Sequence, residues 1–342
     1  MHSYFNLQNR RYIGNKYKLL NWIFENVKKN CDGDSFFDIF AGTGVVCERF
    51  LSTYNKTIIN DLLYSNNIIY NAFFNSNELD YKRLQKVASD LVVLSEKDAE
   101  QNYFDKNFGN KFFSKNDARK IGFIRETLNV FMADKKINEK EYRVLLASLI
   151  YSVDKISNTV GHYDAYIKNK KIDDKFQFNL IRNIDTSNKK IEIYRDDANR
   201  LAKKIEADII FIDPPYNSRQ YSRFYHILEN LVEWKKPKLY GTALKPEVEN
   251  MSDYCRANAK DVFADLVENL SCKYIVVTYN NTFKSKSSSS QNKITLEQIA
   301  DILKNRGETK ISSKDHRFFN SGKTRFDDHR EYLFITKVKK SA

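Results

Sequence analysis

The residues with the clearest chemical meaning are the tetrapeptide Asp213-Pro214-Pro215-Tyr216. It follows the apolar run 207–212, which predicts a buried parallel strand. Because two consecutive prolines cannot continue the hydrogen-bond ladder of a strand, the chain must leave the sheet here. A carboxylate, two backbone carbonyls and an aromatic ring are therefore left at the carboxyl end of a strand, where open α/β sheets bind ligands. This set suits the task of holding a planar, amino-bearing base while its nitrogen is alkylated.

The residues of this tetrapeptide can have separate roles in binding such a base. An aromatic amine is a poor nucleophile because its lone pair is delocalised into the ring. Hydrogen bonds from the amine to the Asp213 carboxylate and the Pro214 carbonyl would localise and aim the lone pair, while Tyr216 can stack on the base. In-line displacement then needs mainly positioning and charge stabilisation. The competing interpretation is a proline-rich turn after a strand.

A second motif, Asp38-x-Phe40-x-Gly42-x-Gly44, follows an expected strand and opens an expected helix. Glycines allow the backbone to approach a ligand closely. A dinucleotide-binding fingerprint would need a third glycine, but Cys47 stands in its place. A cofactor that binds without a phosphate, such as S-adenosylmethionine, fits better, and an ordinary tight turn is the alternative.

Two further acids follow expected strands. Asp61 comes about 20 residues after the glycine turn, where a carboxylate can accept both ribose hydroxyls of an adenosyl group. In Asp196-Asp197-Ala198, a carboxylate at the end of a strand could accept the exocyclic amine of an adenine in the same cofactor. The alternatives are a surface aspartate for Asp61 and helix capping by Asp196 or Asp197.

These motifs need a common sheet to bring them together. The strand–turn–helix–strand–acid pattern is typical of the opening of a Rossmann-like, doubly wound, mostly parallel α/β sheet. We expect its strands at 35–40, 56–60, 190–194, 207–212, 273–279 and 331–336, with the segment around 310–312 as the antiparallel partner of the last.

The alternation of strand and helix stops between residues 77 and 190. Ser114 and Asn138 are capping signals ahead of apolar residues at helical spacing. A structureless connection of this length would be improbable in a compact domain. We therefore expect a discontinuous catalytic domain, 1–76 and 191–342, interrupted by a mainly helical domain with a task of its own.

The composition favours a polyanionic partner. The 342 residues carry a net charge of +13, which suits nucleic acid, although the abundance of Lys, Asn, Ile, Tyr and Phe also fits an AT-rich genome. The four cysteines lie far apart without metal-ligand spacing, so we expect reduced thiols and no metal. No apolar run reaches the roughly 18 residues that span a bilayer, and the N-terminus lacks the apolar core of a signal peptide. We expect no membrane association and a cytoplasmic location.

Taken in order, these motifs resemble the Dam-type N6-adenine DNA methyltransferases of the alpha group. The matching features are Arg11-Tyr12-x-Gly14-x-Lys16, Asp38-x-Phe40-x-Gly42-x-Gly44, Asp61, the helical insert, Asp197-Ala198 and Asp213-Pro214-Pro215-Tyr216. The resemblance implies transfer of a methyl group from S-adenosylmethionine to N6 of an adenine flipped out of double-stranded DNA. It also implies a restriction–modification setting, with a cognate restriction endonuclease as a possible partner.

The resemblance also assigns residues to tasks. It implies catalysis at Asp213 to Tyr216 and cofactor contacts from Tyr12, Lys16, Asp38, Phe40, Gly42, Gly44, Asp61, Asp197 and Ala198. The insert 77–190 would read base edges as a target-recognition domain. Phosphate contacts would come from basic residues, and the candidates for DNA contact are Arg219, Tyr221, Arg223 and the Lys-rich loop 284–293.

Three other functions share part of this pattern. An RNA guanine or adenine amino-methyltransferase can carry an Asp-Pro-Pro-Tyr site, but such enzymes usually lack the Arg-Tyr-x-Gly-x-Lys element and a helical insert. A non-catalytic DNA-binding protein would not need Asp61 and Asp213 intact. A protein-glutamine methyltransferase typically has Asn where this chain has Asp213.

Overall fold

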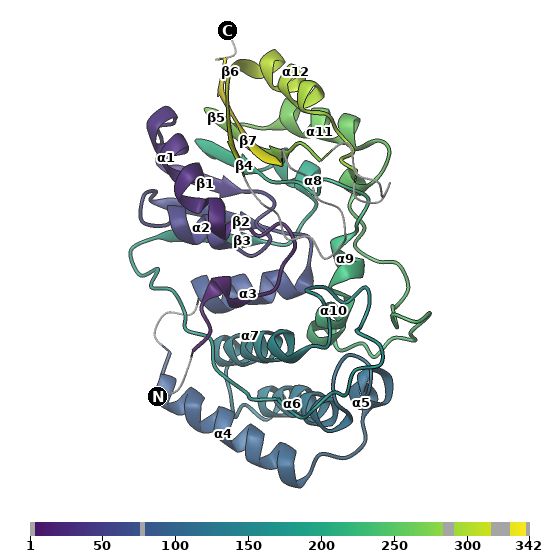
Figure 1. The fold of residues 1–342 in the computed structure, drawn as a ribbon. Coiled ribbons are helices and arrows are strands. Elements are labelled where there is room, and N and C mark those ends of the chain that lie inside the picture. Colours follow the sequence, from purple (N-terminus) through teal and green to yellow (C-terminus); the bar gives the residue numbers. More distant parts are fainter. Residues whose placement is uncertain (1–3, 76–78, 283–290, 316–328, 340–342) are drawn as a thin grey trace. The chain divides into compact units, whose positions relative to one another are not determined.

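The chain folds into two compact units. The computed structural model describes residues 4–75, 79–282, 291–315 and 329–339 (Figure 1). The unit that contains the sheet is made of residues 14–62, 188–221 and 250–342. The helical unit is made of residues 1–13, 63–187 and 222–249, so it includes segments on both sides of the stretch 77–190.

The sheet unit is built on a seven-stranded sheet in the order β3-β2-β1-β4-β5-β7-β6. The first five strands are parallel, and β7 runs antiparallel to β5 and to β6. The strands are β1 Ser35–Asp38, β2 Lys56–Asn60, β3 Lys190–Tyr194, β4 Ile209–Ile212, β5 Tyr274–Asn280, β6 Gly307–Asp315 and β7 Arg330–Val338. This confirms the Rossmann-like, mostly parallel α/β sheet that the sequence predicts, including the antiparallel partner of the last strand.

Helices cover both faces of this sheet (Figure 1). On one side lie α1 (Leu20–Asn30) and α2 (Val45–Phe50), and on the other lie α8 (Ala198–Ala202), α11 (Ala259–Asn269) and α12 (Leu296–Arg306). Neighbouring side chains of β1 pack on opposite faces of the sheet. Phe36 stacks on Phe50 of α2 with ring centroids 4.4 Å apart, whereas Phe37 joins the apolar core beneath α8 and α11. Successive side chains of a strand point to opposite faces, so β1 is buried from both sides.

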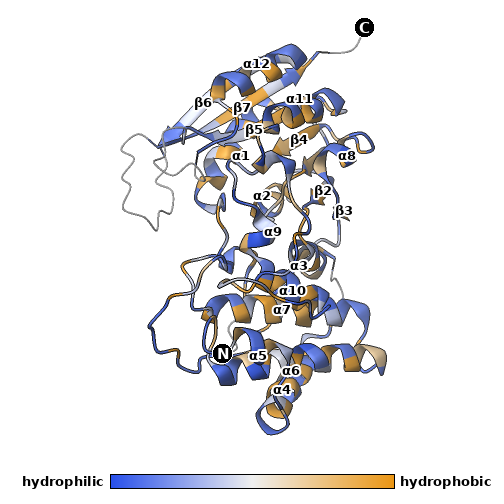
Figure 2. Cartoon of the chain, turned by 90° about the vertical axis from the view of Figure 1, so that its right-hand side faces the viewer, coloured by the Kyte–Doolittle hydropathy of each residue, from blue (hydrophilic) through white to orange (hydrophobic). Residues whose placement is uncertain are grey.

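The helical unit packs around α7, in which every residue from 144 to 154 is buried. Its neighbours α4 and α6 alternate hydrophilic and hydrophobic residues, as expected of helices with one solvent-exposed side (Figure 2). Asn138 and Glu141 form a reciprocal capping box at the start of α7, and the Ser114 hydroxyl caps α6, as the sequence predicts. The helices are α3 Tyr64–Phe74, α4 Tyr81–Lys97, α5 Tyr103–Phe108, α6 Lys115–Ala133, α7 Glu139–Ile156 and α10 His226–Glu233.

Short elements complete the described chain. Helix α9 (Tyr221–Phe224) spans the boundary between the two units. Three 3-10 turns are η1 Leu7–Asn9, η2 Tyr17–Leu19 and η3 Asp253–Cys255. None of the helices in the described part of the chain is long and apolar enough to cross a membrane.

Asp208 joins the amino ends of neighbouring strands. Its carboxylate accepts hydrogen bonds from the backbone amides of Asp34 and Ser35, at 2.8 and 3.0 Å, and from the Ser35 hydroxyl at 2.9 Å. Lys273, just before β5, pairs with it at 2.8 Å. Partial burial alone would raise the pKa of Asp208, but these contacts outweigh it and lower the pKa to about 2.

We predict that Asp208→Asn lowers the free energy of unfolding at pH 7 by about 1–3 kcal/mol, because a hydrogen-bonded charge is lost. The pKa of Asp208 in the folded chain lies below its ordinary value of 3.8. Its stabilisation is therefore complete above that pH and disappears as the pH falls towards about 2. Urea unfolding at pH 7 and at pH 3 measures the difference, which should be smaller at pH 3. Asp301→Asn, on the exposed face of α12, is the control, and an equal loss in that variant would contradict the prediction.

Candidate active site

The candidate active site lies at the carboxyl ends of β1 and β4. The order of the chain reverses between these neighbouring strands, because β2 and β3 continue on one side and β5 on the other. A ligand-binding crevice in an open parallel sheet forms at such a switch point. Asp38 ends β1, pairing in register with Phe211 of β4, and Asp213 follows β4 directly.

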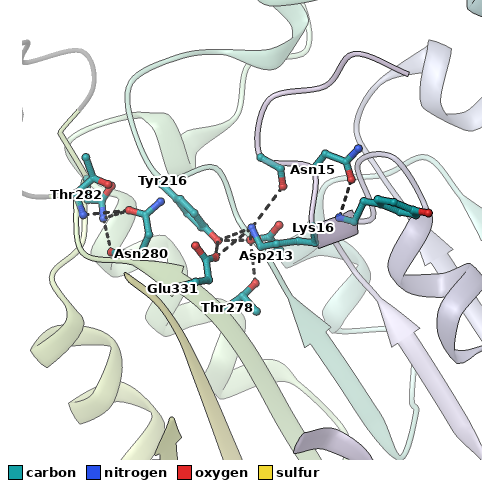
Figure 3. A network of polar contacts seen from close by, with 11 residues as sticks. Asn15, Lys16, Asp213, Tyr216, Thr278, Asn280, Thr282 and Glu331 are labelled. Atoms are coloured by element: carbon teal, nitrogen blue, oxygen red, sulfur yellow. Dashed lines mark hydrogen bonds and ion pairs between the residues drawn. The ribbon is translucent and has the colours of Figure 1, made fainter. Parts of the chain in front are cut away.

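The Asp213 carboxylate is bound by a buried lysine (Figure 3). The Lys16 ammonium is 2.8 Å from Asp213 Oδ1 and 2.9 Å from the Tyr216 hydroxyl, and only 6% of the Lys16 side chain is exposed. Thr278 of β5 donates to the same carboxylate oxygen at 2.9 Å, and the Tyr216 hydroxyl also donates to it. The fold thus brings Lys16, from the motif near the N-terminus, against Asp213 and Tyr216 of the tetrapeptide.

Tyr216 is fixed at its ring and at its backbone. The ring centroid lies 4.5 Å from that of Tyr279, and the backbone carbonyl accepts a hydrogen bond from the Lys293 amide at 2.8 Å. Burial raises the pKa of Tyr216 well above its ordinary value, and the charges of Asp213 and Glu331 raise it further. The hydroxyl therefore remains a proton donor at neutral pH. Stacking of this ring on a base stays a prediction.

Two acceptors of the tetrapeptide have no donor in the described part of the chain. All the contacts of the Asp213 carboxylate are made through Oδ1, and none is made through Oδ2. The carbonyl of the buried Pro214 likewise receives no hydrogen bond there. With 17% of its side chain exposed, Asp213 is more accessible than Lys16. Two acceptors, one charged and one neutral, are what an amino group with two hydrogens requires.

Asp38 is a buried carboxylate that accepts fewer hydrogen bonds than its two oxygens could. The Cys47 thiol lies 3.8 Å from Oδ2, and the backbone amide of Phe40 also favours the charged carboxylate, while Oδ1 is buried and makes no hydrogen bond of normal geometry to a described residue. Burial raises the pKa of Asp38 well above its ordinary value, and the charges of Asp213 and Asp61 raise it further. A buried acceptor without a donor is costly, so this position fits a ligand that brings a donor or a positive charge.

The glycine turn after β1 is joined to the end of β2. Gly42 and Gly44 have φ angles of +53° and +80°, a region that favours glycine. The Gly42 amide donates to Asp61 Oδ2 at 3.0 Å. The acid that the sequence predicts for a ribose therefore lies directly against the glycine turn.

Asn60 is a positioning residue that the sequence analysis did not identify. Its side-chain amide donates to the carbonyls of Ile39 and Asp196 at 3.0 and 3.1 Å and accepts from the Asp196 amide at 3.0 Å. It therefore connects the carboxyl ends of β1, β2 and β3. The only signal in the sequence is a polar residue closing an apolar strand immediately before Asp61.

The remaining predicted cofactor residues of the sheet unit have structural contacts of their own. Asp197 caps α8 by accepting from the Arg200 amide at 3.0 Å, as in the capping alternative. Ala198 is buried in the core, and Phe40 packs edge-on against Tyr254 at 5.0 Å. Their contacts with a cofactor stay predictions.

Two predicted site residues belong to the helical unit. Tyr12 stacks on Tyr225 with the rings 4.8 Å apart and nearly parallel. Arg223 donates to the carbonyl of Pro246 at 2.7 Å, and burial lowers its pKa. Each side chain is therefore already part of the packing of its own unit.

The other residues predicted to contact DNA lie after the tetrapeptide or near the end of β5. Arg219 and Tyr221 belong to the sheet unit, and Tyr221 begins α9. Most of the Lys-rich loop 284–293, residues 284–290, lies outside the described residues. Within the described ranges, no group of three or more His, Cys, Asp or Glu side chains is placed to hold a metal ion.

A sheet with an acid–proline–proline–tyrosine site at its switch point and a glycine turn beside it is the arrangement of an amino-methyltransferase. Residues 12–294 match the model of the D12 class N6 adenine-specific DNA methyltransferases, so the chain belongs to this family. This confirms the resemblance seen in the sequence.

This chain is similar to type II methyltransferases and modification methylases. It is 34% identical to the type II methyltransferase M.FokI of Planomicrobium okeanokoites, over 95% of this chain and 52% of the relative. It is 32% identical to the modification methylase StsI of Streptococcus sanguinis, over 86% and 46%. It is 29% identical to the type II methyltransferase M.NlaIII of Neisseria lactamica, over 95% and 98%. The chain thus spans about half the length of the first two and nearly all of the third.

We predict that Asp61→Ala weakens the binding of S-adenosylmethionine about 10–100-fold, because hydrogen bonds to a charged group contribute roughly 1.5–3 kcal/mol. Equilibrium dialysis with the labelled cofactor measures the dissociation constant. Asp261→Ala, on the exposed face of α11, should bind like the unchanged chain. Equal affinity in Asp61→Ala and in this control would remove Asp61 from the cofactor site.

Proposed function

We propose that this chain is a DNA adenine methyltransferase that moves a methyl group from S-adenosylmethionine to N6 of adenine in double-stranded DNA. Membership of the D12 family supports the reaction class. The observation that carries the proposal is the pair of acceptors, Asp213 Oδ2 and the Pro214 carbonyl, beside the glycine turn at the switch point.

The cofactor fits the residues at the ends of β1 and β2. Asp61 and the turn at Gly42 would hold its adenosyl part, and the unsatisfied Oδ1 of Asp38 would accept from a donor or face a positive charge. When bound, S-adenosylmethionine supplies an electrophilic methyl group on a sulfonium cation. The contact of Lys16 with the cofactor stays a prediction. Its ammonium lies between Asp213 and Glu331, which supports an additional role in positioning the Asp213 carboxylate.

The target amine would be bound and aimed by the chain itself. Its two hydrogens would bond Asp213 Oδ2 and the Pro214 carbonyl, which localises the lone pair on nitrogen. As the nitrogen took up the methyl group, the methyl–sulfur bond of the cofactor would break and its electron pair would stay on sulfur. Positive charge would build on the nitrogen, the fixed Asp213 carboxylate would stabilise it, and the nitrogen would then release its excess proton to solvent. Such preorganised charge is a main source of catalysis.

The DNA must present its adenine outside the helix to reach this edge of the sheet. Flipping costs a few kcal/mol of stacking and pairing, which phosphate contacts offset in a chain of net charge +13. We assign sequence recognition to the helical unit, whose main part is residues 77–187 of the expected insert. The names of the relatives, type II methyltransferases and a modification methylase, support a restriction–modification role with a cognate endonuclease.

We predict that the unchanged chain forms N6-methyladenine in duplex DNA and that Asp213→Asn lowers its kcat about 10²–10³-fold, as expected when a preorganised charge is removed. Asn keeps the shape of the side chain, so cofactor binding should change little. Incubation with labelled S-adenosylmethionine and either duplex DNA or RNA, followed by nucleoside analysis, measures both product and rate. Asp253→Asn, at the exposed first residue of the turn η3, is the matched control.

Two results would contradict the proposal. Undiminished activity in Asp213→Asn would exclude the mechanism. Label found in guanosine of RNA, and not in adenine of DNA, would exclude the substrate.

We predict that cofactor affinity increases with pH as Asp38 ionises. The pKa of this buried carboxyl is raised, so it is protonated at low pH and gains the charge that attracts a cation as the pH rises. Asp38→Asn cannot ionise, so the variant should bind more weakly and lack this part of the pH dependence. Calorimetric titration between pH 6 and pH 9 measures the difference between the two chains, and parallel pH profiles would show that Asp38 does not take part.

A further inference from the structure

Glu331 is a second buried carboxylate beside Asp213, and no motif of the sequence marks it. It lies at the start of β7, where it pairs in register with Asn280 of β5. Only 4% of its side chain is exposed. A buried carboxylate is costly unless other groups bond it, so its partners indicate what it does.

Its partners are those of Asp213. Glu331 Oε1 lies 3.2 Å from the Lys16 ammonium and 2.9 Å from the Tyr216 hydroxyl (Figure 3). The same ammonium and the same hydroxyl bond Asp213 Oδ1. Two carboxylates from different strands therefore share one lysine and one tyrosine.

A count of protons shows how the two carboxylates differ. The ammonium has three hydrogens, and its three nearest acceptors are Asp213, the Tyr216 hydroxyl and Glu331, with the Gly14 carbonyl farther away at 3.5 Å. The hydroxyl lies between two carboxylate oxygens but has one hydrogen to give. If both carboxylates were ionised, one of these two oxygen–oxygen contacts would lack a proton. A proton on Glu331 completes the set, because Glu331 then donates to Tyr216 and Tyr216 donates to Asp213.

The electrostatics of Glu331 agree with this arrangement. Burial raises its pKa, the charge of Lys16 opposes the rise, and the charge of Asp213 adds to it. Asp213 Oδ1 meets only donors, from Lys16, Thr278 and Tyr216, as an ionised carboxylate requires.

We propose that Glu331 is a positioning residue for methyl transfer: acting through Tyr216 and Lys16, it holds Asp213 by Oδ1, so that Oδ2 faces the amino group to be methylated. The inference rests on the proposed function, because it assigns a purpose to the free oxygen of Asp213. It also gives the Tyr216 hydroxyl a task separate from that of its ring, since the hydroxyl is the link between the two carboxylates.

The experiment compares Glu331→Gln and Glu331→Ala with the unchanged full-length chain on S-adenosylmethionine and duplex DNA. Gln has the shape of a protonated Glu. Its N–H can take the place of Oε1 and donate to Tyr216, and only the 3.2 Å contact with Lys16, which Oε1 also makes, is lost. Its kcat should therefore stay within about 3-fold of the unchanged chain. Ala removes the contacts of Glu331 with Tyr216 and Lys16, so Asp213 is held less firmly. The kcat of this variant should fall about 10–100-fold, as when a reacting group is misplaced by about 1 Å. The KM for the cofactor should change little. Glu308→Ala, exposed on the neighbouring strand β6, should match the unchanged chain.

The pH profile separates positioning by a protonated Glu331 from simple packing. Among the described residues, Lys16, Asp213 and Tyr216 are the titratable groups that most affect Glu331, and Lys314 of β6 is its register partner on the neighbouring strand. As the pH rises and Glu331 loses its proton, the link to Tyr216 breaks, so the activity of the unchanged chain should fall on the alkaline side. Glu331→Gln cannot lose that proton and should keep its activity there. This comparison does not need Glu331→Ala to fold.

Each outcome decides one question. Full activity in a folded Glu331→Ala, or identical pH profiles for Glu331→Gln and the unchanged chain, would overturn the inference. A Glu331→Gln variant as impaired as Glu331→Ala would overturn the assignment of the proton. If the unchanged chain forms no N6-methyladenine, the proposed function fails, whereas an active chain with an equally active Glu331→Ala contradicts the inference alone.

Discussion

The site depends on one buried positive charge. Lys16 lies almost wholly out of water, which would be prohibitive for an unpaired ammonium. Burial opposes its charge, yet Asp213 and Glu331 outweigh that effect and the pKa of Lys16 is raised. The ammonium thereby joins three parts of the chain: the segment before α1, the loop after β4 and the start of β7. The orientation of Asp213 follows from this contact, because the oxygen facing the lysine cannot also face a substrate.

The carboxyl edge of the sheet concentrates negative charge in a positively charged protein. Asp38, Asp61 and Asp213 influence one another at the ends of adjacent strands, while the whole chain carries +13. The folded chain can hold these carboxylates close together only if some of them are protonated or neutralised. Their mutual repulsion, added to burial, raises the pKa of Asp38. A sulfonium cofactor suits the negative edge, and a polyanionic duplex suits the remainder of the chain. The two proposed ligands are thus attracted by charges of opposite sign.

Much of the catalytic fold could be predicted from local sequence. Short segments with apolar centres marked β1, β2 and β4, and the proline pair marked the end of β4, because these signals act within a few residues of each other. The extent of the helical unit could not be predicted in the same way. It takes in 222–249, including α10, a segment that follows the catalytic loop. Only packing decides which layer such an amphipathic helix joins.

The sequence by itself determined the kind of chemistry and the family, because the tetrapeptide at Asp213 and the glycine turn at Gly42 are local patterns with local geometric causes. Only the tertiary structure decided how Asp213 is oriented. Lys16 and Tyr216 are 200 positions apart, and Glu331 is 115 positions from Tyr216. No periodicity relates residues at such separations. Their contact arises because the carboxyl ends of the parallel strands and the start of the antiparallel strand β7 lie at one edge of the sheet. There the buried ammonium forms ion pairs with two carboxylates.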